Sequence, residues 1–172
     1  AFAIGYDWLY DLWTPEQRAK VEKALYELGR SYIKQAKYNE AISTYDKLIA
    51  GFPNGATARR ALAERAMIYN SMDDRDNALK SYKEIIEKYP GSEEAVVAIE
   101  DIKSIYVDMG RVDLFAEYVA ETKGMQPVES SEIDTLTYIA AEKAYSRGNL
   151  EEAKKAFEEY LQNHPAGAFR LN

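Results

Sequence analysis

The amino-acid sequence repeats with a fixed period of 37 residues, and this period constrains the fold more than any other feature. The recurring positions are Ala41 with Ala78, Tyr45 with Tyr82, and Pro53 with Pro90, each pair being 37 residues apart. A period of a few tens of residues is typical of proteins in which one small structural unit stacks on the next. The sequence therefore predicts an array of similar units.

The spacing within the first unit matches a known helical repeat. Between Leu25 and Tyr32 the chain reads Leu-x2-Leu-Gly-x2-Tyr. The small, aromatic and proline positions of the repeat follow at Ala41, Tyr45 and Pro53. This pattern resembles the tetratricopeptide repeat, and with its later copies it covers about residues 22–165. The resemblance implies an all-α fold, an α-solenoid of antiparallel helix pairs with about four repeats.

The later units match the pattern to different degrees. Tyr106 lies 37 residues after Tyr69, but Phe115 occupies the position of the small alanine in the third unit. The fourth unit, GNLEEAKKAFEEYLQNHP, restores the pattern with Ala153 and ends at Pro165. We therefore expect the packing of the third unit to differ from that of the other three.

Helix signals predict eight helices arranged as four pairs. Their expected ranges are about 15–36 and 38–51, 56–72 and 75–89, 92–109 and 112–122, and 131–147 and 150–163. A proline follows the second helix of three pairs, at Pro53, Pro90 and Pro165, and marks the turn because it cannot continue a helix.

The longest polar connection is the stretch Lys123–Glu132. At its end we expect Ser130 or Ser131 to cap the next helix, because serine side chains accept hydrogen bonds from free backbone N–H groups there. The acidic residues Glu132 and Asp134 then lie at favourable positions near the positive end of the helix dipole.

An aromatic run, AFAIGYDWLYDLWTPEQ, precedes the first unit. Its apolar residues at helical spacing predict a separate N-terminal helix over residues 1–13, before a repeat array over residues 14–172. We expect Thr14 to be the N-cap of the next helix, Pro15 its first residue, and Gln17 the reciprocal partner of the cap. The run is too short to span a bilayer and lacks the pattern of a signal peptide. It is expected to act as a cap or as a contact between copies.

The stretch after Pro165 reads AGAFRLN, whereas the stretches after Pro53 and Pro90 lead into a further helix. Solenoids usually end in a polar capping helix, because the last unit otherwise exposes an apolar face. We therefore expect the array to be truncated at its C-terminal end, or to pair that open end with another copy.

The charge distribution bears on the class of partner. Residues 1–86 carry 13 Lys and Arg against 12 Asp and Glu, and the remaining residues carry 9 against 17, so the two halves have net charges of +1 and −8. An acidic surface repels phosphate backbones and anionic headgroups, so a nucleic acid or a membrane surface is a poor partner. A protein or a peptide is the partner that we expect.

The sequence lacks the residues that most catalytic sites require. It contains no cysteine, which excludes thiolate catalysis and cysteine-bound zinc, and its one histidine, His164, is expected in a surface turn. No HExxH, glycine-rich phosphate loop or GxSxG motif occurs. The acidic clusters at residues 73–76 and 151–159 lack the spacing of a calcium loop and are interpreted as solvated turns or helix faces. We expect no cofactor, no metal and no enzyme activity.

The resemblance also implies where a partner binds. In tetratricopeptide repeat proteins the first helix of each pair lines a concave groove that holds an extended peptide or a partner helix. Carried over by register, the candidate groove residues are Tyr26, Arg30, Lys34, Arg60, Met67, Asn70, Glu100, Ser104, Asp108, Tyr138 and Glu142. The residues that clamp a terminal carboxylate in some members are not reproduced, since Tyr26 and Arg30 occupy the first pair of positions.

Together these features predict a non-catalytic protein–protein interaction scaffold. The 37-residue spacing is similar to that of bacterial envelope members of the family, which implies the bacterial cell envelope or periplasm, with the cytoplasm as an alternative. A second interpretation stays open, because residues 1–24 resemble a helical segment of the heparinase II/III-like polysaccharide lyases. On that interpretation the chain is a helical fragment of such a lyase or a fusion with one.

Overall fold

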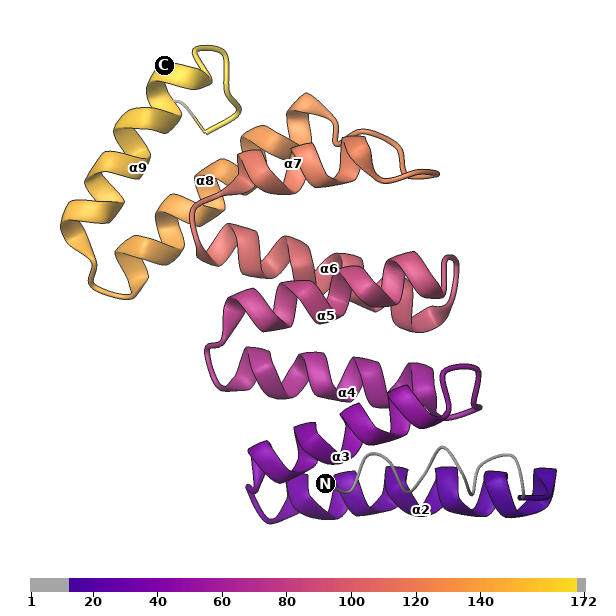
Figure 1. Ribbon diagram of the computed structural model, residues 1–172. Helices are drawn as coiled ribbons and strands as arrows, with labels where there is room; N and C mark the ends of the chain where they lie inside the picture. Colours follow the sequence, from indigo (N-terminus) through magenta and orange to yellow (C-terminus); the bar gives the residue numbers. More distant parts are fainter. Residues whose placement is uncertain (1–12, 170–172) are drawn as a thin grey trace. The chain divides into compact units, whose positions relative to one another are not determined.

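The computed structural model describes residues 13–169, and within this range the chain is entirely α-helical (Figure 1). The helices are α2 (Pro15–Lys34), α3 (Tyr38–Gly51), α4 (Ala58–Ser71), α5 (Arg75–Lys88), α6 (Glu93–Asp108), α7 (Val112–Glu121), α8 (Ser130–Ser146) and α9 (Leu150–Asn163). The predicted ranges agree with these bounds to within two residues at each end. Except for Trp13, the aromatic helix predicted over residues 1–13 lies outside the described residues.

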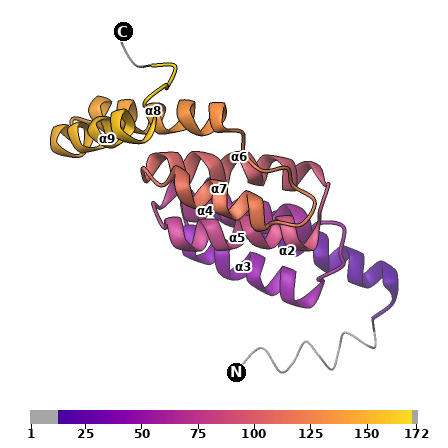
Figure 2. The same cartoon turned by 90° about the horizontal axis from the view of Figure 1, so that it is seen from above.

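The chain divides into two compact units, Ala1–Ile99 and Glu100–Asn172, and the division falls inside α6. In the first unit, α2 packs against α3 and α4 against α5, while α3 also contacts α4 (Figure 1). In the second unit, α8 packs against both α7 and α9, and Figure 2 shows α8 and α9 side by side.

The start of α2 is fixed by the predicted capping box. The Thr14 hydroxyl accepts a hydrogen bond from the Gln17 backbone N–H at 3.2 Å, and the Gln17 side-chain oxygen accepts one from the Thr14 N–H at 2.8 Å. Pro15 follows as the first helical residue. Both prolyl geometry and the cap favour a helix start at this point, so the prediction is confirmed.

Small residues bring the two helices of the first two pairs together, as the repeat pattern predicts. Ala41, Ala66 and Ala78 are completely buried. A Cβ atom at Gly29 would lie 2.2 Å from the Tyr45 ring, so only glycine leaves room for this ring. Phe115 is also buried, which shows that the third repeat places a large ring where the others place a methyl group.

The second unit has its own apolar core. Val107, Val112 and Ala140 form a buried cluster, and Ile133, Leu136 and Ile139 of α8 pack against it. Apolar residues at spacings of three and four on α8 therefore face α6 and α7.

The expected serine cap of α8 is wrong. Glu129 is the N-cap residue and forms no side-chain cap hydrogen bond, while Ser130 is the first residue inside the helix. The Ser131 hydroxyl instead lies 3.5 Å from the Glu129 carboxylate. Asp134 has a different role from the one predicted, because it is buried and accepts a hydrogen bond from the Ala168 backbone N–H at 2.8 Å.

Candidate functional site

The first unit carries a groove of about 500 Å³ between α2 and α4, bounded at one end by the start of α3. Its lining residues are Arg30, Ile33, Lys34, Tyr38, Glu64, Met67, Ile68 and Ser71. Three residues predicted for the groove, Arg30, Lys34 and Met67, are among them. We call this depression the α2–α4 groove.

Helical periodicity explains which side chains meet in the α2–α4 groove. On α4 the lining residues Glu64, Met67, Ile68 and Ser71 follow one another at intervals of three, one and three, which is one face of a helix. Register alone placed Asn70 in the groove, but Asn70 is not among its lining residues. The helical spacing from Met67 was the signal that could have identified Glu64, Ile68 and Ser71.

Glu64 lies at the base of this groove and connects three helices. The Tyr26 hydroxyl of α2 donates a hydrogen bond to Glu64 Oε1 at 2.6 Å, and the Tyr45 hydroxyl of α3 donates one to Glu64 Oε2. Burial, the hydrogen bond and the negative charge of Glu64 raise the pKa of Tyr26 to about 12, and the same causes raise the pKa of Tyr45. Both phenols are therefore neutral donors at physiological pH, and each oxygen of Glu64 already has a partner.

Cationic side chains at the groove have few partners within the protein. Arg30 lies 3.7 Å from Glu27 in an exposed pair, and its guanidinium carbon is 6.0 Å from the centre of the Tyr26 ring. Lys34 and Arg60 are exposed and form no ion pair within residues 13–169. Exposed ion pairs such as Arg30–Glu27 contribute little to stability, so Glu27 holds Arg30 only weakly. The groove therefore presents uncommitted positive charge.

The candidate residues of the second unit mainly form internal contacts. The Asp108 carboxylate lies 2.7 Å from Lys143 Nζ and 2.9 Å from Arg147 Nη2, so it ties α6 to α8. Burial raises the pKa of Asp108. The hydrogen bond from Lys143 and the positive charges of Lys143 and Arg147 outweigh this effect and hold the pKa below its usual value. Glu100 pairs with Lys103 at 2.9 Å, and Ser104 is exposed.

Tyr138 belongs to an aromatic cluster. Its ring stacks on Phe169 at 4.3 Å and meets Phe157 and Tyr160 edge-on at 5.8 and 5.5 Å. A hydrogen bond to Glu142 raises the pKa of Tyr138. Tyr138 and Glu142 thus contact one another, and the ring also packs against α9 and the turn that follows it.

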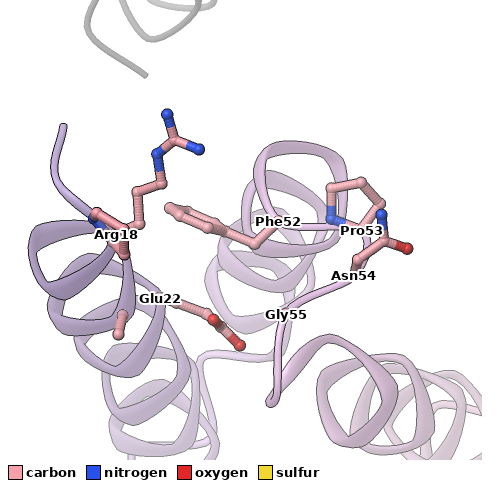
Figure 3. Close-up of a pocket in the computed structure, with 8 residues that line it drawn as sticks. Arg18, Glu22, Phe52, Pro53, Asn54 and Gly55 are labelled. Carbon is pink, nitrogen blue, oxygen red and sulfur yellow. The ribbon is translucent and has the colours of Figure 1, made fainter. Parts of the chain in front are cut away.

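A second hollow of about 300 Å³ lies between the start of α2 and the turn after α3 (Figure 3). Figure 3 shows Glu22 extending from α2 toward Gly55, with the Phe52 ring on the same side of α2. Glu22 Oε1 accepts hydrogen bonds from the Thr57 N–H at 2.5 Å and the Thr57 hydroxyl at 2.8 Å. The Glu22 carboxylate thus fixes the turn before α4 through its hydrogen bonds to Thr57.

His164 lies in the predicted turn, as the C-cap residue of α9, but most of its side chain is covered. Its ring is half-buried, stacks on Tyr160 at 5.2 Å between ring centres, and places Nδ1 3.5 Å from the Asp134 carboxylate. Asn-His-Pro predicts the turn correctly, but the sequence did not indicate that Tyr160 and Asp134 would cover its histidine.

Two further observations concern the described residues alone. No group of three or more His, Asp or Glu side chains among residues 13–169 is arranged to hold a metal ion. In the same range, none of the helices has the length and apolar character required to cross a membrane.

The sequence model of the tetratricopeptide repeat matches residues 23–55, 60–92 and 137–166, which together make up more than half of the chain. The unmatched residues 93–136 contain the third repeat, with Phe115 in place of alanine. No curated protein matches the sequence.

Several solved structures are similar to this chain. MamA (residues 41 to the end) from Desulfovibrio magneticus RS-1 has 10% identity and a TM-score of 0.48, covering 86% of this chain and 76% of that one. A second MamA structure has 19% identity and a TM-score of 0.46, covering 90% and 89%. The TPR-like repeats of a putative kinesin light chain from Podosopora anserina have 15% identity and a TM-score of 0.48, covering 92% and 79%.

Proposed function

Because the chain belongs to the tetratricopeptide repeat family, and family members bind protein partners, we propose that it is a non-catalytic scaffold that holds an extended peptide segment of a partner in the α2–α4 groove. The observation that carries this proposal is the groove itself, whose lining combines the apolar side chains of Ile33, Met67 and Ile68 with the cations Arg30 and Lys34. Small-molecule and peptide sites commonly have this combination of apolar area and a few polar groups.

The exposure of Met67 supports the proposal. Its side chain is 60% exposed although it lies in the groove beside the buried Ile68. Methionine is flexible and polarisable, and is frequent at surfaces that accept varied peptide side chains. Covering Met67 and Ile33 with a ligand removes apolar area from water and favours binding.

Rigidity of the groove supports the proposal as well. Tyr26, Tyr45 and Glu64 connect α2, α3 and α4 through two hydrogen bonds beneath it. A site that is formed before the ligand arrives loses less conformational entropy on binding. The groove is therefore suited to a peptide that becomes ordered on a fixed surface.

Site-specific crosslinking of selected peptides tests the proposal. A random peptide library is selected on the wild-type protein, and the enriched peptides are added to two variants with a photoreactive amino acid, one at Met67 and one at Lys80. Both positions are exposed, but Lys80 lies on α5 and does not line the groove. We expect crosslinks at position 67 and none at position 80; failure to enrich any peptide, or equal crosslinking at both positions, contradicts the proposal.

A further inference from the structure

The α2–α4 groove has two cations in a row along one helix. Arg30 and Lys34 are four residues apart on α2, so they lie about 6 Å apart along the helix axis and share one face. In an extended peptide, side chains at positions i and i+2 point to the same side and are about 6.7 Å apart. The spacing of the two cations thus matches alternate side chains of an extended strand.

From this match, and on the basis of the function proposed above, we infer that the α2–α4 groove recognises a peptide segment with an acidic, apolar, acidic pattern. The two carboxylates face Arg30 and Lys34 on α2. Because side chains alternate along a strand, the apolar residue between them points the other way, toward Met67 and Ile68 on α4. One extended peptide lying between α2 and α4 therefore places its two carboxylates against α2 and its apolar side chain against α4.

The electrostatic balance of the groove favours an acidic ligand. Among residues 13–169, Glu64 is the only acidic residue that lines the groove, and both of its oxygens already accept hydrogen bonds from tyrosines. Arg60 does not line the groove, but it lies one helical turn before Glu64 and adds a further exposed cation on α4. Glu27 competes for Arg30, but at 3.7 Å and with both side chains about half exposed it is a weak competitor.

The geometry favours internal acidic side chains over a terminal carboxylate. A single terminal carboxylate is bound best by cations that converge on one point. Arg30 and Lys34 are instead spaced along the axis of α2, so each meets a separate carboxylate.

Defined peptides measured by fluorescence anisotropy test the inference. The probe is a labelled decapeptide with a central Glu-Leu-Glu in Gly-Ser flanks, acetylated and amidated so that it has no terminal charge. Comparison peptides contain Glu-Glu-Leu, Glu-Ser-Glu or Lys-Leu-Lys at the same place. A further peptide with Gln-Leu-Gln and a free C-terminal carboxylate represents the other source of negative charge.

We expect Glu-Leu-Glu to bind about three- to tenfold more tightly than each comparison peptide, because each of them lacks the apolar contact, the ion pairs or the alternate spacing of the three side chains. Affinity should fall as salt rises, because the charges are solvent-exposed. In the variant with Arg30→Glu and Lys34→Glu the preference should reverse in favour of Lys-Leu-Lys. The matched control, Lys47→Glu with Lys80→Glu, alters the net charge equally on exposed positions of α3 and α5, and should behave as wild type.

Reversal of the preference cannot result from misfolding, since an unfolded variant binds neither peptide. Equal affinity for Glu-Leu-Glu and Glu-Glu-Leu, or tighter binding of the peptide with the free carboxylate, overturns the inference. If library peptides crosslink at position 67 but lack the acidic, apolar, acidic pattern, the inference is wrong while the function proposed above stands. If no peptide is enriched at all, both are wrong.

Discussion

Glu22 on α2 accepts a hydrogen bond from the backbone N–H of Thr57, the residue that precedes α4, at a distance of 2.5 Å. Glu22 lies 19 residues before the buried Ala41 of its repeat, and Thr57 lies 16 residues after it. The corresponding positions around Ala78 are Arg59 and Glu94, whose side chains form an ion pair at 2.6 Å. In the first two repeats, a polar contact between these positions thus fixes the turn that leads into the next helix.

The last repeat contains a similar arrangement, with the donor one position earlier in the turn. Asp134 lies 19 residues before Ala153, and its carboxylate accepts a hydrogen bond from the Ala168 N–H at 2.8 Å. Gly55 and Gly167 each lie 14 residues after the alanine, and a Cβ atom at either would meet the carboxylate at 2.5 Å. In these two repeats, an acidic residue on the first helix and a glycine in the turn together form one structural element.

We predict that Gly55→Ala and Glu22→Ala destabilise the protein through the same contact. The new methyl group displaces the Glu22 carboxylate, which is the mobile end of its side chain, and so breaks its hydrogen bonds to Thr57. Each single substitution should lower the unfolding free energy by about 1–3 kcal/mol. The double variant should lose little more than the larger single loss, because once Glu22 is absent the methyl group meets no carboxylate. Chemical denaturation of the four proteins measures this coupling, and additive losses would contradict it.

In the last repeat, Asp134→Ala should release the turn after α9. The Ala168 N–H loses its acceptor and His164 loses the carboxylate 3.5 Å away. We expect amide hydrogen exchange at Ala168 to accelerate by about tenfold or more, since its protection depends on this one bond. Asp113→Ala, at an exposed acidic residue in the first turn of α7, serves as the control and should leave Ala168 unchanged. Unaltered exchange at Ala168 in Asp134→Ala would show that this bond does not hold the turn.

Low pH should also weaken the turn after α9, because it protonates Asp134. The hydrogen bond from Ala168 lowers the pKa of Asp134, burial acts in the opposite direction, and Tyr160 and His164 lower the pKa further. A carboxyl with a lowered folded-state pKa contributes stability above its unfolded pKa and loses it as pH falls through the folded value. Protection of Ala168 should therefore persist at neutral pH and decline below the usual pKa of aspartate.

Gly29→Ala is predicted to be destabilising although alanine is the better helix former. In the interior of α2 the substitution should favour the helix by about 1 kcal/mol. However, the added Cβ would lie 2.2 Å from Tyr45 Cε1 and 2.7 Å from Tyr45 Cζ, and this ring is completely buried and cannot move aside. We expect a net loss of about 1–3 kcal/mol. Gly51→Ala, which meets no atom within 4 Å, is the matched control and should change stability by less than about 0.5 kcal/mol.

Much of the fold could be predicted because its signals are local. Thr14, Pro15 and Gln17 define a helix start within four residues of sequence, and the 37-residue period defines the units. The polar contacts between helices could not be predicted in the same way. Glu64 has the sequence context of a solvated helix residue, and only the stacking of α2, α3 and α4 brings it between two tyrosine hydroxyls. Likewise, no local pattern indicated that Asp134 would be buried against Ala168.

The groove was predicted in part for the same reason. The register of the repeat identified Arg30, Lys34 and Met67, because equivalent positions of the first helices face the same side. Register does not say how far around α4 the groove extends, which depends on the exact rotation of the helix against α2. Ile68 was therefore missed, and Asn70 was included although it does not line the groove.

The hydrogen bond between Tyr26 and Glu64 predicts a characteristic alkaline dependence of stability. The pKa of Tyr26 is raised from its usual value of 10.0 to about 12, so between these values the folded protein retains a proton that the unfolded chain has lost. Stability from this group is thus complete below pH 10 and declines as pH rises toward 12. Near neutral pH, Tyr26→Phe should lower the unfolding free energy by about 1 kcal/mol through the lost hydrogen bond. The difference between wild type and Tyr26→Phe, measured by denaturation, should shrink from pH 10 toward pH 12, while contributions from tyrosines that do not contact Tyr26 or Glu64 are common to both proteins and cancel. A difference that stays constant across this range would mean that Tyr26 ionises alike in the folded and unfolded chains, and that Glu64 does not hold its proton.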